Sequence, residues 1–168
     1  VEHRAMHDVL TGLLNRAEIL DRLALALGDA AAHGHVTGVV FCDVDDFKDV
    51  NDSHGHRAGD AVLQAVARRL TGRLRQGDLV GRIGGDEILV VLENIGDLER
   101  AERLAASLLE GAAVPVDVAG QPIEVTMSAG VTLASVADSV DDLVARADRA
   151  MFAAKHAGKN RVVALPAP

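Results

Sequence analysis

Apolar residues recur along this chain with two different periods, and each change of period marks a boundary between a predicted helix and a predicted strand. In residues 10–34 a loop leads into a helical pattern. Its apolar stripe consists of Ile19, Leu20, Leu23 and Leu27. Asn15 and Glu18 have the spacing of a capping box in which Asn replaces Ser or Thr. The segment therefore predicts a loop followed by an N-capped helix.

Three later segments repeat the helical period. One begins at Asp60, and its apolar positions are Val62, Leu63, Val66, Leu70 and Leu74. Another covers residues 97–112. The last, residues 139–158, is amphipathic and ends at Gly158, a residue type typical of helix C-caps.

Short apolar runs between these helices predict strands. Residues 36–46 form a buried strand that ends in acids, and residues 78–83 and 87–92 form a hairpin around a Gly-Gly-Asp turn. A pair of strands surrounds Ala119 and Gly120 in residues 114–133, and residues 161–165 form a last strand. Residues 47–60 are polar and contain glycines, which favours a short helical turn and a loop. The order predicts one α/β (α+β) domain, residues 1–168, with a mixed, mostly antiparallel sheet.

Composition narrows the class of protein. With 168 residues, 49% of them hydrophobic, the chain can bury a sizeable core. Its formal net charge of -8 argues against binding a nucleic acid polymer, but not against a nucleotide held through a metal. Cys42 is the single cysteine, so a reducing, cytoplasmic location fits. No apolar run reaches the ~18 residues of a membrane span, so we expect no direct membrane contact by this domain. The abrupt ends favour a domain excised from a longer, multidomain protein.

Two groups of acids stand at the ends of apolar strands. Asp43, Asp45 and Asp46 end the first strand, and Asp86 and Glu87 lie in the hairpin turn. If the two strands are neighbours, Asp43 faces Asp86, and alternation places Asp43 and Asp45 on one face. Such carboxylates suit Mg²⁺, with Mn²⁺ as a substitute. The alternative is that acids cluster at turns because water solvates them there.

The turn glycines, Gly84 and Gly85, allow a positive φ and the close approach of a ligand, although a plain hairpin turn also explains them. Nearby, Lys48 supplies a cation, and Asn51 and Asp60 can read a purine edge.

Other residues of these segments have two interpretations. His56 either contacts a nucleotide or caps the loop, and Gly55 and Gly59 fit plain loop glycines. Lys155 and Lys159 suit the end of a helix dipole or, equally, a triphosphate.

Four blocks in order and spacing resemble the GGDEF family of diguanylate cyclases. They are HDVLTGLLNR, DVDDFKDVNDSHGHRAGD, RQGDLVGRIGGDEILVVL and ADRAMFAAKHAGKNR, which together extend from His7 to Arg161. The resemblance implies the palm-like fold of nucleotidyl cyclases, a sheet wrapped by helices. It also implies that two subunits, each holding one GTP, meet as a homodimer, make cyclic di-GMP and release two pyrophosphates.

The resemblance further assigns roles to residues. The implied metal ligands are Asp43, Asp86 and the carbonyl of Val44. Asp86 also matches the general base, and Glu87 matches the residue that supports metal and nucleotide. Lys48 matches the residue that stabilises the pentavalent phosphorus. The implied nucleotide contacts are the backbone N–H groups of Asp46 and Phe47 for phosphate, Asn51, His56 and Asp60 for the nucleoside, and Lys155 and Lys159 for the triphosphate.

Two positions depart from the family pattern, and one further motif matches it. Ile88 replaces Phe in the fifth position of the motif, and Lys159 stands where Arg is common. We expect Ile88 to point into the core, and Lys159 to bind phosphate as a point charge rather than a fork. Arg75 and Asp78 have the spacing of the family's inhibitory product site; the alternative is an exposed ion pair.

The alternative function is a catalytically silent module that binds GTP or cyclic di-GMP and regulates an attached domain. Silent relatives usually lose the acids or glycines of the turn, and this chain keeps them.

Overall fold

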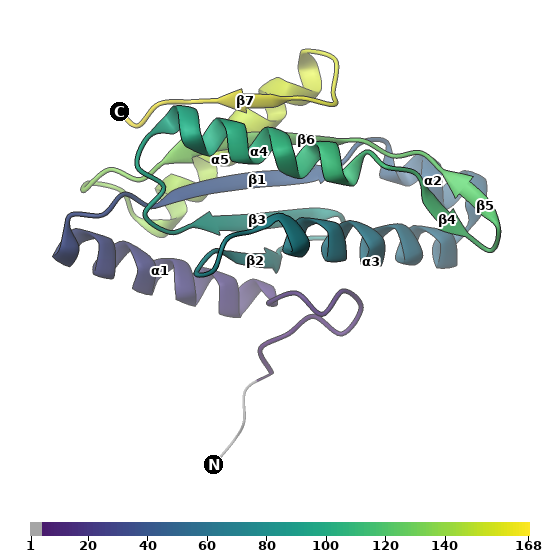
Figure 1. Cartoon of the computed structure of the whole chain (residues 1–168), viewed down its shortest axis with the longest axis horizontal. Helices are drawn as coiled ribbons and strands as arrows, with labels where there is room; N and C mark the ends of the chain where they lie inside the picture. Colours follow the sequence, from purple (N-terminus) through teal and green to yellow (C-terminus); the bar gives the residue numbers. More distant parts are fainter. Residues whose placement is uncertain (1–4) are drawn as a thin grey trace.

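A computed structural model describes residues 5–168 as a sheet with helices on both faces (Figure 1). The helices are α1 (Arg16–His33), α2 (Phe47–His54), α3 (His56–Arg73), α4 (Leu98–Ala112) and α5 (Val140–His156). The strands are β1 (Gly38–Val44), β2 (Leu79–Arg82), β3 (Glu87–Leu92), β4 (Val116–Val118), β5 (Gln121–Ile123), β6 (Met127–Leu133) and β7 (Val162–Ala164). None of the helices in this part of the chain is both long and apolar enough to cross a membrane.

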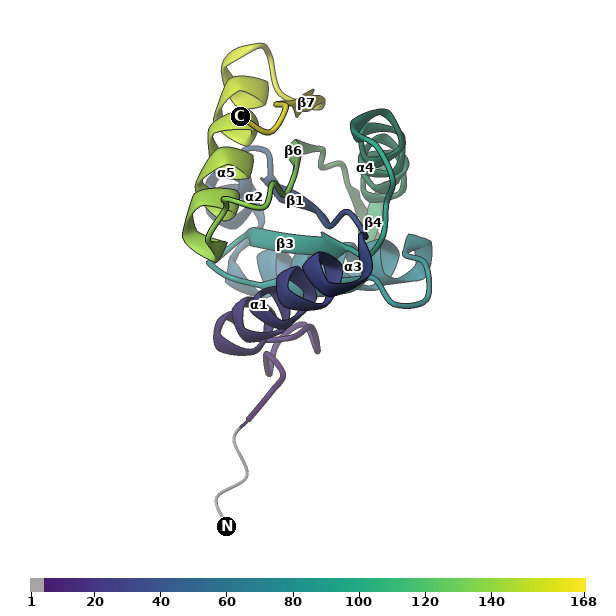
Figure 2. The same ribbon diagram turned by 90° about the vertical axis from the view of Figure 1, so that its left-hand side faces the viewer.

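The main sheet has the strand order β2-β3-β1-β6-β7. Neighbouring strands are antiparallel except β6 and β7, which are parallel, so the predicted mixed, mostly antiparallel sheet is confirmed. All seven residues of β1 are buried because this central strand has helices on both faces. The helices α4 and α5 lie on opposite sides of the sheet (Figure 2).

Alternating side chains of the central strands supply two separate cores. Val40, Cys42 and Val44 of β1 pack with the apolar residues of α3 and α4. Val39 and Phe41, which point the other way, pack with residues of α1 and α5. The sheet is thus held from both faces, which fixes the ends of β1 and β3 relative to each other.

The caps of α1 and α5 follow the sequence only in part. Asn15 caps α1 by accepting a hydrogen bond of 2.9 Å from the backbone of Glu18, but the Glu18 carboxylate bonds Arg22 instead of closing the predicted box. A complete box occurs at α5, between Ser139 and Asp142. Gly158 follows the cap residue of α5 with a φ of 122°, so it lies one position later than predicted.

Two element predictions were wrong. Residues 114–133 contain three strands, because β5 turns back on β4 at Ala119–Gly120 and β6 then joins the main sheet. Residues 47–60 are helical apart from Gly55: α2 ends at His54, and α3 begins at His56 rather than at Asp60. The polar pattern misled because α2 buries only Val50.

Candidate active site

The two acidic groups predicted to meet do lie together at one end of the sheet. The antiparallel register of β1 and β3 pairs Asp43 with Glu87, and Asp86 comes directly before β3. Asp43 is 9% exposed, so its carboxylate lies beneath the surface rather than in bulk water. The sequence prediction of a shared acidic site is therefore met in its geometry.

Lys155 of α5 supplies the positive charge that these acids need. Its Nζ lies 2.5 Å from Asp43 Oδ1 and 3.5 Å from Asp45 Oδ1. Asp43 Oδ1 is buried, and Lys155 Nζ is its close charged partner among the described residues. Burial lowers the pKa of Lys155, but the hydrogen-bonding and electrostatic interactions with Asp43 and Asp45 outweigh it and raise the pKa overall.

Burial and mutual repulsion still disfavour the charged form of these carboxylates despite Lys155. Burial raises the pKa of Asp43 to about 6 against the opposing charge of Lys155, and the charges of Asp86 and Asp45 add to the rise. Burial also raises the pKa of Asp86 and of Glu87. A further cation at this place would relieve the repulsion.

The residues fit a magnesium ion held jointly with a substrate. Within residues 5–168 no group of three His, Cys, Asp or Glu side chains is close enough to enclose a metal. Mg²⁺ usually binds through one or two carboxylates and through substrate phosphates. Asp43, whose Oδ1 has the displaceable Lys155 ammonium as its partner, meets that description together with Asp86.

Residues that had no role in the sequence prediction hold the turn of the hairpin. Arg82 donates hydrogen bonds to the carbonyls of Gly84 (3.2 Å) and Gly85 (2.8 Å) and to the carboxylate of Asp8 (3.2 Å). Arg16 donates to the carbonyl of Ile83 at 3.2 Å. Asp8, Arg16 and Arg82 all lie in the sequence blocks that resemble the GGDEF family, and this position was the signal that could have identified them.

The two turn glycines differ in what they contribute, and neither supplies a left-handed backbone conformation. Neither Gly84 nor Gly85 has a left-handed φ, so the predicted positive φ is wrong. A Cβ on Gly84 would lie 2.1 Å from Glu87 Oε1, whereas one on Gly85 would meet open space. Gly84 therefore makes room for the Glu87 carboxylate, and Ile88 beside it is buried in the core as predicted.

The residues predicted to bind guanine gather where α2 meets α3. Asn51 is half-buried, and His56 and Asp60 are exposed on the first turns of α3. Gly59 is a buried residue of α3 rather than a loop glycine. A Cβ there would lie 1.9 Å from Asn51 Oδ1, so the glycine makes room for the Asn51 side chain. Lys48 is exposed on α2.

The turn from β1 into α2 presents backbone groups at the same end of the sheet. Val44 is the last residue of β1, and Asp46 follows with a left-handed φ of 54°. Phe47 begins α2, so its N–H has no acceptor within the helix. The Nζ of Lys159 lies 2.5 Å from Asp46 Oδ1.

Asp45 does not join Asp43 as a second open carboxylate. It lies beyond the end of β1, and its oxygens accept hydrogen bonds from Thr126, Ser128 and the backbone of Asn160. Burial alone would raise the pKa of Asp45, but these donors hold it below its usual value. Asp45 and Asp43 nevertheless both face Lys155, as the predicted alternation along the strand implies.

Arg75 and Asp78 form a closed pair between α3 and β2. The guanidinium donates two hydrogen bonds of 2.9 Å to the carboxylate. Asp78 has a fully buried side chain and also accepts from the backbone of Arg75 and of Glu93, whereas the Arg75 side chain is 44% exposed. The pair is thus anchored in the fold through Asp78, while the Arg75 guanidinium stays exposed.

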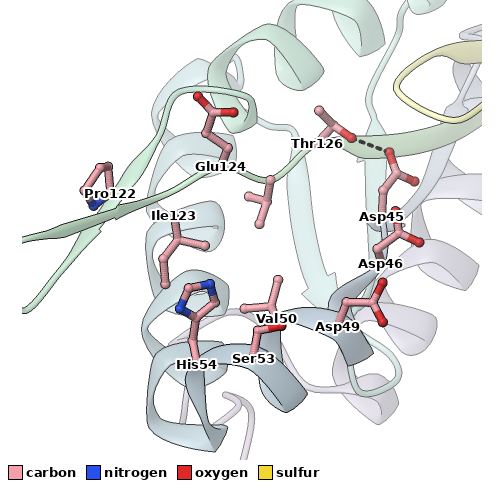
Figure 3. A pocket seen from close by; sticks show the side chains of 11 residues that line it. Asp45, Asp46, Asp49, Val50, Ser53, His54, Pro122, Ile123, Glu124 and Thr126 are labelled. Atoms are coloured by element: carbon pink, nitrogen blue, oxygen red, sulfur yellow. Dashed lines mark hydrogen bonds between the residues drawn. The ribbon is translucent and has the colours of Figure 1, made fainter.

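A cavity of about 430 Å³ lies beside the acidic end of β1, between α2 and residues 122–126 (Figure 3). Asp45 and Asp46 line it, together with Asp49, Val50 and Ser53 from α2. None of Lys48, Asn51, His56 and Asp60 does. The cavity is therefore on the other side of α2 from the predicted guanine contacts.

Comparisons with known proteins place the whole chain in one family. Residues 5–161 match the family model described as "Diguanylate cyclase, GGDEF domain". The chain is 39% identical over 170 residues to the diguanylate cyclase TpbB of Pseudomonas aeruginosa. The aligned region covers 99% of this chain and 39% of that protein. The chain thus spans about two fifths of the length of this curated relative.

Two solved structures have the same fold. Diguanylate cyclase SiaD of Pseudomonas aeruginosa, in complex with its activator SiaC, matches with a TM-score of 0.92 and 36% identity over 96% of this chain and 62% of that one. The GGDEF domain of DgcB from Caulobacter crescentus, in complex with cyclic di-GMP, matches with a TM-score of 0.90 and 27% identity over 98% of both chains.

Proposed function

Because the chain belongs to the GGDEF family, we propose that it is a diguanylate cyclase, which condenses two molecules of GTP into cyclic di-GMP and releases two molecules of pyrophosphate. The observation that carries the proposal is the meeting of Asp43, Asp86 and Lys155 at the end of the sheet. Buried carboxylates with a lysine between them suit a triphosphate that arrives with its own cation.

Each subunit binds one GTP in this proposal. Asn51 and Asp60 hydrogen-bond the guanine edge, His56 contacts the nucleoside, and Lys155 and Lys159 exchange their carboxylate partners for the triphosphate. The N–H groups of Asp46 and Phe47 donate to phosphate oxygens at the start of α2. Two subunits then face each other so that each 3'-hydroxyl lies beside the other α-phosphate.

The chemical step forms a bond from the 3'-oxygen to the α-phosphorus and breaks the bond from that phosphorus to the β-phosphate oxygen. Asp86, whose pKa burial raises, accepts the hydroxyl proton, and Lys48 stabilises the charge on the pentavalent phosphorus. Asp43, Asp86 and the Val44 carbonyl, with Glu87 in support, would hold Mg²⁺ or Mn²⁺, which when bound would neutralise phosphate charge and lower the pKa of the hydroxyl.

The product site belongs to the same proposal. Cyclic di-GMP binds at Arg75 and Asp78, where a guanidinium can grip guanine or phosphate bidentately. The Arg75 guanidinium is paired with Asp78 in this structure, so it has to leave that carboxylate to bind the product. Asp78 then keeps the hydrogen bond from the backbone of Glu93.

Incubation with GTP and Mg²⁺, followed by mass analysis of the products, tests the function. A cyclic dinucleotide from GTP and none from ATP supports it. Binding of GTP without turnover, at every protein concentration, would instead identify a regulatory module.

A further inference from the structure

The Asp45 carboxylate is a buried junction between three segments of the chain. Its side chain is 3% exposed. Oδ1 accepts a hydrogen bond of 2.6 Å from Ser128 Oγ, and Oδ2 accepts from Thr126 Oγ1 at 2.7 Å and from the backbone N–H of Asn160 at 3.0 Å. One carboxylate thus ties the end of β1 to the start of β6 and to the turn between α5 and β7.

The turn that Asp45 holds has an unusual backbone. Gly158, Lys159 and Asn160 have successive φ values of 122°, 66° and 47°, all in the left-handed region. Side-chain-bearing residues adopt this conformation only where surrounding contacts impose it. The hydrogen bond from Asn160 to Asp45 is such a contact, directly after Lys159.

Of the two lysines of the proposed site, one shortly precedes this turn and the other lies inside it. Lys155 lies in the last turn of α5, with its Nζ 3.5 Å from Asp45, and Lys159 lies inside the turn and reaches Asp46. Both ammonium groups therefore meet consecutive residues of the segment that leads from β1 into α2. Their placement depends on how this turn docks against that segment.

We propose that Asp45 is a positioning residue for Lys155 and Lys159, which sets them at the distance a triphosphate requires, and that it is not a metal ligand. The inference rests on the proposed function, because it takes the lysines as phosphate contacts. Both Asp45 oxygens accept hydrogen bonds from Ser128, Thr126 and the Asn160 backbone, whereas the partner of Asp43 Oδ1 is the Lys155 ammonium, which a bound ligand can displace. Metal binding at Asp45 would break bonds that hold the turn.

The variant Asp45→Asn tests the proposal because its amide nitrogen cannot accept the hydrogen bonds that one carboxylate oxygen accepts. Calorimetry with Mg²⁺ measures the affinity for GMP and for a GTP analogue whose α–β bridge is a methylene group, which cannot lose pyrophosphate. We expect about tenfold weaker binding of the triphosphate, the weight of one charge-assisted contact, and GMP affinity within about twofold of wild type. Asp117→Asn, an exposed acid on β4, is the matched control and leaves both affinities unchanged.

A double-mutant cycle separates positioning from other roles. If Asp45 acts through the lysines, Asp45→Asn and Lys159→Ala weaken triphosphate binding less than additively. Full additivity, an equal loss for GMP, or a lower affinity for Mg²⁺ alone in Asp45→Asn would each overturn the proposal. Should Asp45→Asn not fold, Thr126→Val removes one donor to Oδ2 and permits the same comparison.

Hydrogen exchange gives a readout that does not depend on nucleotide. The Asn160 amide is expected to exchange faster in Asp45→Asn than in wild type, and unchanged exchange would contradict the positioning role. If wild type itself binds no GTP analogue, the proposed function fails while this measurement still decides whether Asp45 holds the turn.

Discussion

At the scale of single residues, the site is a balance of buried charges. Asp43, Asp86 and Glu87 all have a pKa raised by burial, and Lys155 is the cation nearest to Asp43. Lys159 is similarly paired with Asp46. In the proposed complex with GTP, both lysines exchange these carboxylate partners for phosphates.

Asp86 is the residue on which the chemistry depends most. The variant Asp86→Asn keeps the size of the side chain but removes the proposed base and one charged metal ligand. We expect turnover of GTP to fall by about 10²-fold or more, the usual contribution of a general base. Initial rates of pyrophosphate release measure this, with Asp117→Asn as the control. Near-normal turnover would remove Asp86 from both roles.

Guanine selectivity is assigned to Asn51 and Asp60 at the junction of α2 and α3. Asp60 is exposed, so Asp60→Ser should leave the fold intact while it removes the carboxylate that accepts from the guanine N–H groups. We expect weaker GTP binding and a smaller preference for GTP over ATP. Competition binding of the two nucleotides gives the ratio, and an unchanged ratio would show that other residues read the base.

At the scale of elements, the hydrophobic pattern predicted the main sheet well because its central strands are buried on both faces. Whether β1 lies beside the hairpin was left open by the sequence, and the structure pairs β1 with β3 antiparallel, which brings Asp43 beside Glu87. The pattern failed at α2, which has one buried apolar residue, and at β5, which is three residues long and pairs only with β4. Short elements have too few positions to establish a period.

The site was predictable only where neighbouring residues create it. The acids of the turn and of β1 were identified from strand ends. Contacts between distant segments were not: Arg82 reaches Asp8, and Lys155 reaches Asp43. The saturation of Asp45 likewise depends on β6 and on the turn after α5, and no local pattern reports such tertiary contacts.

The corner between α3 and β2 carries the proposed product site. Arg75→Ala removes the exposed half of the pair, whereas Asp78 retains its bonds from the backbone of Arg75 and Glu93. We therefore expect Arg75→Ala to bind cyclic di-GMP much more weakly and to lose product inhibition, with basal turnover unchanged. Calorimetry with the product and inhibition curves measure both effects.

Arg75→Lys is the matched control for this site. It keeps the charge but not the bidentate geometry, so we expect intermediate affinity for the product. Equal affinity in wild type and Arg75→Ala would leave the pair with a structural role only.

At the scale of the whole molecule, a buried ion pair links the sheet to α5. Arg146 is 5% exposed and donates two hydrogen bonds to Asp138, one to Thr132 and one to the carbonyl of Leu133. The Arg146 guanidinium lowers the pKa of Asp138 to about 2, with further help from Ser135. This pair fixes the start of α5, the helix that carries Lys155.

The lowered pKa of Asp138 predicts a pH-dependent stability. A carboxylate with a lower pKa in the folded state stabilises that state above its unfolded pKa of 3.8, and this stabilisation disappears as the pH falls toward 2. We expect a contribution of about 1 to 2 kcal/mol to the free energy of unfolding. Urea unfolding of wild type and Asp138→Asn between pH 2 and pH 6 tests it. The difference between the two should be constant above pH 5 and shrink below pH 4; a constant difference throughout would contradict the shift.

Because the proposed catalysis needs two facing half-sites, protein concentration is the decisive variable for the whole molecule. The most direct measurement follows cyclic di-GMP and pyrophosphate together, from GTP and Mg²⁺, over a wide range of protein concentrations. For a diguanylate cyclase we expect two pyrophosphates per cyclic di-GMP. We also expect a specific activity that rises with protein concentration until dimerisation saturates. Intact binding of GTP with neither product at any concentration would contradict it.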